Sequence, residues 1–157
     1  MARATTKQQW GVGSVFGVEQ TDHKYCIGQV LEIPLPNVIS CAFYDIRLPK
    51  GLKQPKVELP FEKIISALAT TRDKLDAGRW KIISSATPQL DRQFWPNEQF
   101  RDMQWVGAKT YGSRIVENFL EAYFGLAPWD RYADPEYFDK LLFFQHRKPL
   151  SLRFKHL

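Results

Sequence analysis

The stretch KYCIGQVLEIPLPNVISCAFYDI, residues 24–46, decides the fold class of this chain. It begins and ends with runs rich in β-branched and aromatic residues, 24–33 and 38–46, which suit a pleated, half-buried surface. The PLPN segment between the runs ends the first one, because proline cannot donate a hydrogen bond to a strand ladder. The pattern therefore predicts two neighbouring strands joined by a short turn.

The residues before this stretch extend the same sheet. GSVFGVEQ, residues 13–20, is a third β-rich run, and the polar TDH break after it predicts a turn. Three adjacent antiparallel strands with short connections predict a twisted antiparallel sheet or a partial barrel. The first dozen residues, 1–12, are expected to form a loose lead-in.

The middle of the chain allows two interpretations. Residues 63–86 fit a strand, a short helical connection and a second strand, whereas the frequent Ala and Leu residues also fit a continuous helix through Leu75. Residues 87–100 are aromatic and irregular, which predicts a loop laid over the sheet.

The last third has helical patterns. Ser113 is expected to cap a helix over residues 113–124, and Gly125 suits its C-terminal end. The face of this helix that is expected to be buried carries Ile115, Phe119, Ala122 and Tyr123.

A second helix is predicted over residues 134–143. Asp134 would be its N-cap and Pro135 its first-turn residue. Glu136 and Lys140 have the spacing of an exposed ion pair. Together these elements predict one α+β domain over residues 1–157, with a basic C-terminal tail at 144–157.

The net charge of +5 belongs to the chain ends. Six of the 22 basic residues lie outside residues 13–143, which leaves 16 bases against all 17 acids in that span. A neutral body argues against nucleic-acid binding, which needs clustered Lys and Arg. The chain also lacks an apolar run long enough to span a membrane and an N-terminal signal core, so a cytoplasmic protein is expected.

The sequence offers no catalytic or metal-binding motif. It has no His-x-x-x-His pair, no Gly-rich phosphate loop after a strand and no calcium loop, so neither a metal nor a cofactor is expected. Cys26 and Cys41 lie in apolar strand patterns, which predicts buried, reduced thiols. His23 is not placed to activate Cys26, because it falls in the turn and the odd spacing puts the two on opposite faces of an extended chain.

Charge is distributed unevenly in the last third. From Glu117 to Asp139 the chain has six acids and a single base, Arg131. Aromatic residues, which are preferred anchors of protein interfaces, lie among these acids. The residues expected to contact a basic protein partner are Glu117, Glu121, Trp129, Asp130, Tyr132, Glu136 and Asp139, although Asp134 is expected to serve the helix and each acid alone also fits an ordinary solvated face.

Several motifs in order resemble one known family. GSVFGV, YCIGQVLEI, CAFYDI, GRWKII, GLAPWD and DPEYFDKLL are similar to the immunity protein twenty-six family over roughly residues 13–142. This resemblance implies a cytosolic α+β protein from a bacterial polymorphic-toxin or contact-dependent inhibition system, which binds and blocks one toxin domain and has no catalysis of its own. The recurring residues matched here are expected to be fold-makers: Gly28, Tyr44, Asp45, Trp80 and Trp129.

The expected function is therefore neutralisation of a cognate toxin domain, with a nuclease as one candidate toxin. The sheet surface around Tyr44 and Asp45 is a second candidate contact region. The first alternative is a small barrel-type RNA-binding module, in which aromatic residues such as Phe43, Tyr44 and Trp80 would stack on bases. The second is a hydrolase that uses paired carboxylates, such as Asp130 and Asp134.

Overall fold

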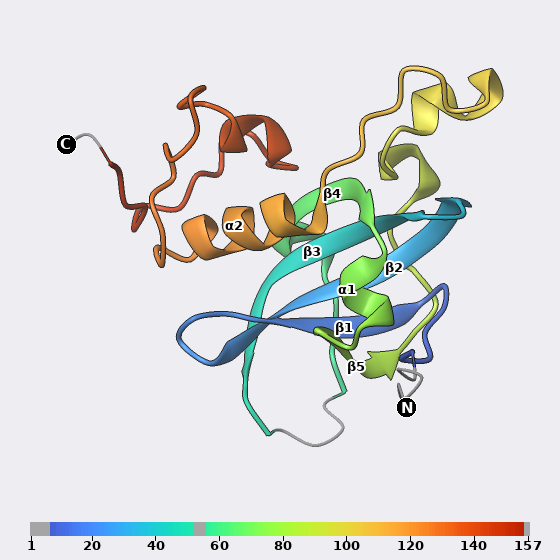
Figure 1. Cartoon of the computed structure of the whole chain (residues 1–157), viewed down its shortest axis with the longest axis horizontal. Helices are drawn as coiled ribbons and strands as arrows, with labels where there is room; N and C mark the ends of the chain where they lie inside the picture. Colours follow the sequence, from blue (N-terminus) through green and yellow to red (C-terminus); the bar gives the residue numbers. More distant parts are fainter. Residues whose placement is uncertain (1–6, 52–55, 156–157) are drawn as a thin grey trace, which may run out of the picture.

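The framework of the protein is a five-stranded antiparallel sheet, seen in a computed structural model that describes residues 7–51 and 56–155 (Figure 1). The spatial order is β4-β3-β2-β1-β5, so the first four strands form a meander and the last returns beside the first. This arrangement confirms the predicted α+β class. The strands are β1 (Ser14–Glu19), β2 (Lys24–Leu35), β3 (Val38–Pro49), β4 (Ile64–Thr71) and β5 (Trp80–Ser85).

The described helical elements are short except for one. Helix α2 (Ser113–Tyr123) has 11 residues, and α1 (Asp73–Asp76) is a single turn. The remaining helical segments are 3₁₀ turns: η1 (Phe61–Lys63), η2 (Arg92–Phe94), η3 (Glu98–Met103) and η4 (Phe138–Leu141).

The two long central strands bend the sheet. Their pairing shifts register after Cys26 and again after Val30. Such irregularities bend a strand and increase its twist. Both faces of the sheet carry buried side chains, and each is covered by a different part of the chain.

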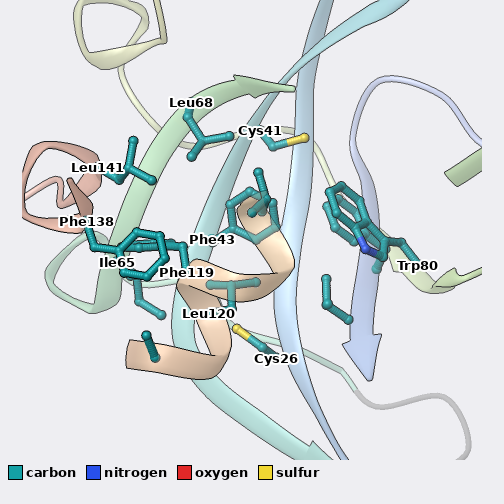
Figure 2. Packing of buried hydrophobic residues seen from close by; sticks show 14 of the residues in the cluster. Cys26, Cys41, Phe43, Ile65, Leu68, Trp80, Phe119, Leu120, Phe138 and Leu141 are labelled. Carbon is teal, nitrogen blue, oxygen red and sulfur yellow. The ribbon is translucent and has the colours of Figure 1, made fainter. Parts of the chain in front are cut away.

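One face forms the main core against α2 (Figure 2). Phe16 stacks on Trp80 with 5.3 Å between ring centroids, and the edge of Phe43 meets both rings. Phe119 and Leu120 of α2 are fully buried against this face. Burial of large apolar side chains supplies most of the stabilisation of such a domain.

The opposite face is covered by the segment that follows β5. Leu90 and Trp95 pack near Leu31, Ala42 and Tyr44 of the central strands. The Trp95 indole N–H donates to the Leu90 carbonyl over 2.9 Å, which fixes the ring over the sheet. The prediction of an aromatic loop over the sheet is confirmed.

Between β4 and β5 the structure decides between the two interpretations. Residues 64–71 form β4, α1 makes the short connection and β5 follows at Trp80. The strand–helix–strand prediction is confirmed and the continuous helix is wrong. Thr70 and Ala69 lie in β4 opposite Ile39 and Ser40 of β3, so pairing with β3 outweighs the local helix propensity of the Ala and Leu residues.

Helix α2 matches the predicted bounds to within one residue but does not have the predicted cap. The N-cap residue is Gly112, and the Ser113 hydroxyl instead donates to the Asp73 carboxylate at 2.9 Å. Because the Ser113 hydroxyl is bonded to Asp73, it does not cap the helix. Gly125 ends the helix as predicted: its φ of +75° allows its own N–H and that of Leu126 to bond back to the last turn.

The predicted helix over residues 134–143 is wrong. Only a 3₁₀ turn, Phe138–Leu141, forms there. The Phe143 N–H donates to Ile65 of β4, and the Leu141 carbonyl accepts from the Ser66 hydroxyl, so these groups are not available to a regular helix. The predicted Glu136–Lys140 ion pair is also wrong, because Lys140 Nζ lies 2.7 Å from an Asp134 oxygen instead.

Asp134 itself still acts as a local cap. Its Oδ1 accepts from the Glu136 N–H at 2.9 Å, which supports the turn before η4.

Described residues near both ends of the chain are bonded to the rest of the domain. The Gln8 side chain bonds to β5, and the Trp10 indole donates to Asp76 at 2.9 Å. In the tail, the Arg153 carbonyl accepts from the Trp129 N–H at 2.8 Å, and Leu152 packs on the core. Gln8 and Trp10 of the expected loose lead-in are thus bonded to the domain, whereas residues 1–6 and 156–157 lie outside the described part.

Candidate interaction surfaces

The two candidate acids on α2 are held by neighbouring elements. Glu121 accepts hydrogen bonds from the Thr21 N–H at 2.8 Å and the Thr21 hydroxyl at 2.9 Å. Glu117 accepts from the Trp80 indole at 3.3 Å and lies 3.9 Å from Lys74 Nζ. Both carboxylates therefore connect α2 to the sheet, a structural use that sequence spacing did not reveal.

Three of the four acids after α2 are bound by other groups of the chain. Asp139 Oδ1 lies 3.0 Å from Lys148 Nζ, and Asp130 accepts from the Lys155 backbone N–H at 2.5 Å. Asp134 is paired with Lys140, whose hydrogen bond lowers the pKa of the carboxyl. Glu136 is exposed, and its carboxylate makes no ion pair with any residue in the described part of the chain.

The candidate aromatic anchors among these acids are largely internal. Trp129 is only 1% exposed and packs against Phe119 and Phe138, while its indole N–H donates to Asp139 at 2.7 Å. Tyr132 is half-buried, and its hydroxyl accepts from Asn118 at 3.0 Å. The structure thus gathers these aromatics into the core beside α2. Their role in binding a partner stays a prediction.

The second candidate surface is divided between core and solvent. Tyr44 is 2% exposed, and burial raises its pKa to about 12. Asp45 is exposed, and the Tyr123 hydroxyl donates to it at 3.5 Å. Beside Asp45 is a hollow of about 220 Å³ that Tyr123, Phe144 and Arg147 help to line.

A surface that the sequence did not predict lies on the face opposite α2. Four phenylalanine rings meet there, from η1, η2 and the segment after η4, with neighbouring centroids 4.9 to 5.6 Å apart. Phe61 is 44% and Phe94 39% exposed, and the Arg147 guanidinium lies 4.1 Å from the centre of the Phe144 ring. We call this set the aromatic patch: Phe61, Phe94, Phe143 and Phe144.

Exposed, clustered aromatic rings are typical of protein interaction sites. The adjacent pair at 143–144 was the only signal in the sequence, because the other two rings come from residues dozens of positions away.

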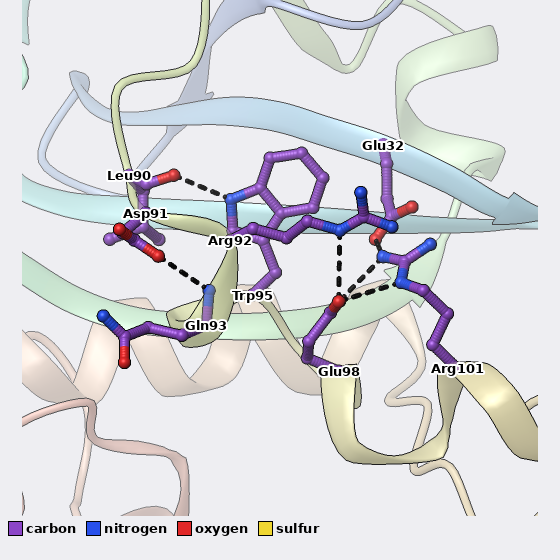
Figure 3. Close-up of polar contacts among 8 residues, drawn as sticks. All are labelled: Glu32, Leu90, Asp91, Arg92, Gln93, Trp95, Glu98 and Arg101. Atoms are coloured by element: carbon purple, nitrogen blue, oxygen red, sulfur yellow. Dashed lines mark hydrogen bonds and ion pairs between the residues drawn. The ribbon is translucent and has the colours of Figure 1, made fainter.

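An ion-pair network holds the segment that carries Phe94 (Figure 3). Arg101 bridges Glu32 of β2 at 2.5 Å and Glu98 at 2.7 Å, and Glu98 also accepts from Arg92 at 3.1 Å. The hydrogen bonds from Arg101 are the largest cause of the lowered pKa of Glu98. The segment that carries Phe94 is therefore anchored to the sheet.

A larger hollow lies elsewhere, between the β1–β2 turn, the α1–β5 turn and α2. It has a volume of about 660 Å³. Its lining mixes carboxylates with cations, including Glu19, Arg79 and Lys81. No group of three or more His, Cys, Asp or Glu side chains within the described ranges is arranged to hold a metal ion.

A family model, Immunity protein 26, matches residues 11–104, which is more than half of the chain. The chain belongs to the immunity protein 26 family. The match confirms the resemblance seen in the sequence motifs, but it ends before α2, so GLAPWD and DPEYFDKLL lie outside it. No curated protein and no solved structure matches the chain.

Membership of the immunity protein 26 family indicates toxin neutralisation and a protein partner. Immunity families act by binding and are generally not enzymes. No helix among the described residues is long and apolar enough to cross a membrane.

The part shared with the immunity protein 26 family is the framework of the fold. The matched residues include all five strands and the covering segment through η3. Gly28 and Trp80 are buried within it, as expected of fold-makers. The acids between 117 and 139 lie beyond the match.

Proposed function

We propose that this protein binds one cognate bacterial toxin domain and neutralises it in the cytoplasm of the producing cell, as part of a polymorphic-toxin or contact-dependent inhibition system. The family match over the whole sheet carries this proposal. The two cysteines support the compartment, because both are free and buried, as is usual for proteins kept under reducing conditions.

A basic toxin, for example a nuclease, is the partner best suited to the charge of the last third. Glu136 supports this part of the proposal, since it presents an exposed carboxylate with no ion pair in the described chain. Four other candidate acids are bound by groups of this chain: Asp130, Asp139, Glu117 and Glu121. Each would contribute only the part of its negative charge that its bonded group does not neutralise. The proposed role of these acids is to guide association, because complementary charge raises association rates more than it raises affinity.

Co-expression tests the proposed function. The probe is the C-terminal domain of the large secreted protein expected in the reading frame upstream. We expect the two proteins to co-purify and the cell to survive a toxin domain that kills it when expressed alone. A toxin domain that remains lethal and unbound would contradict the proposal, and salt-dependent RNA binding by this chain alone would favour the RNA-binding alternative.

Charge reversal tests the proposed steering. Glu136→Lys should slow association with the toxin domain several-fold at low salt and much less at high salt, because screening removes long-range attraction. The matched control is Glu58→Lys, which reverses another exposed glutamate, on the loop before η1. Equal association rates for the two variants in a stopped-flow salt series would show that Glu136 does not face the partner.

A further inference from the structure

The outer edge of β4 is only partly covered. The Phe143 N–H donates to the Ile65 carbonyl at 2.8 Å, and the Tyr111 N–H donates to the Ala69 carbonyl at 2.9 Å. Alternate residues of a strand present their backbone groups to the same edge, so Ala67 must direct its N–H and C=O outward as well. Apart from bonds within the strand ladder, no hydrogen bond from the described residues reaches the N–H or C=O of Ala67.

A hollow lies over this uncovered position. It has a volume of about 280 Å³, and half-buried Ala67 forms part of its lining. Phe94, Tyr111, Leu141 and Phe143 supply apolar and aromatic walls, which makes the hollow continuous with the aromatic patch.

The rim of the hollow carries one cation that is not engaged. Lys109 is exposed and makes no ion pair with any residue that the structure describes. The other lysine of the lining, Lys140, is held by Asp134. A carboxylate of a bound partner could therefore form an ion pair with Lys109.

The opposite edge of the same sheet shows what fits such a position. On β5, the Gln8 side-chain amide donates to the Trp80 carbonyl at 2.9 Å and accepts from the Ile82 N–H at 3.1 Å. One amide group thus satisfies both a donor and an acceptor of an edge strand. Ala67 likewise offers one donor and one acceptor on β4, both from a single residue, and the side-chain amide in the lining, that of Asn97, is bonded to the Lys109 backbone instead.

We propose that the hollow over Ala67 receives a short extended segment of the toxin domain, whose backbone pairs with the N–H and C=O of Ala67. The walls would admit a small apolar side chain, and a neighbouring acidic residue of the segment would meet Lys109. An extended backbone is the ligand whose donors and acceptors match an open strand edge. This inference rests on the proposed function, because the segment belongs to the toxin.

Amide hydrogen exchange on the full chain tests the pairing. In the free protein, the Ala67 amide should exchange much faster than that of Leu68, which pairs with Cys41 in β3. Addition of the upstream-encoded toxin domain should slow exchange at Ala67 by about tenfold or more. A bound toxin that leaves Ala67 unprotected would overturn this inference and leave the proposed function intact, with water as the occupant of the hollow, whereas absence of any complex would overturn both.

Charge reversal at the rim gives an independent measurement. Lys109→Glu should weaken binding of the toxin domain about tenfold, because a carboxylate would then face a carboxylate. The matched control is Lys81→Glu, an exposed lysine on β5 that also has no ion pair in the described chain. The control should change the dissociation constant less than about twofold. Equal losses for both variants would overturn the inference.

Discussion

At the scale of single residues, the main core depends on a position where no side chain fits. A Cβ atom on Gly28 would lie 2.7 Å from the Phe16 ring and 3.0 Å from the Phe43 ring. Those two rings also contact Trp80, which is fully buried. Gly28 is therefore required for close packing of the aromatic rings.

Gly28→Ala should lower the free energy of unfolding by about 1–3 kcal/mol, because overpacking forces the rings out of their preferred positions. Urea denaturation measures this loss. Gly11→Ala is the control, since nothing lies within 4 Å of a Cβ at that glycine. Equal stabilities of the two variants would show that the aromatic rings move aside without cost.

At the scale of secondary-structure elements, the backbone groups of the two edge strands, β4 and β5, are bonded in different ways. The β5 edge is closed by Gln8, whose amide also donates to Leu75 at 2.8 Å and so joins the lead-in to α1. The β4 edge is covered by segments from far along the chain, at Ile65 and Ala69. Open strand edges invite unwanted pairing, and both devices limit it.

Gln8→Ala should cost about 1–3 kcal/mol of stability, because it leaves partly buried backbone groups of Trp80 and Ile82 without their partner. The comparison variant is Gln89→Ala, which removes an exposed side chain bonded only to the Thr87 carbonyl. Chemical denaturation of both variants is the measurement. A Gln8 variant as stable as the Gln89 variant would mean that water replaces the amide at the β5 edge.

At the scale of the whole molecule, α2 and the bent sheet enclose one core that contains both thiols. Cys26 and Cys41 are each 0% exposed, and burial raises the pKa of both thiols well above the usual range. The thiolate is the reactive form, so neither cysteine should react while the core stays closed.

Labelling of Cys26 and Cys41 by a thiol reagent should therefore follow unfolding of the whole domain. We expect slow labelling under native conditions, with a rate that rises steeply with denaturant. Ser85→Cys places a thiol at an exposed position and serves as the positive control. Stoichiometric labelling of the native protein as fast as that of the control would contradict a closed core.

The sequence by itself determined the first three strands, α2 and the burial of Cys26 and Cys41, because alternation, helical periodicity and turn residues act over a few positions. It also contained enough of the shared framework to indicate the immunity family. Only the tertiary structure decided that residues 134–143 form a turn, since bonds to Ile65 and Ser66 compete there with a helix.

The same limit applies to the candidate surfaces. Local spacing showed a cluster of acids, but Lys74, Lys148 and the Lys155 backbone reach those acids from distant parts of the chain. The aromatic patch and the uncovered position at Ala67 likewise depend on segments separated by dozens of residues. Surface chemistry is set by which side chains and backbone groups the fold brings together and which it leaves unpaired, and no short window of sequence contains that information.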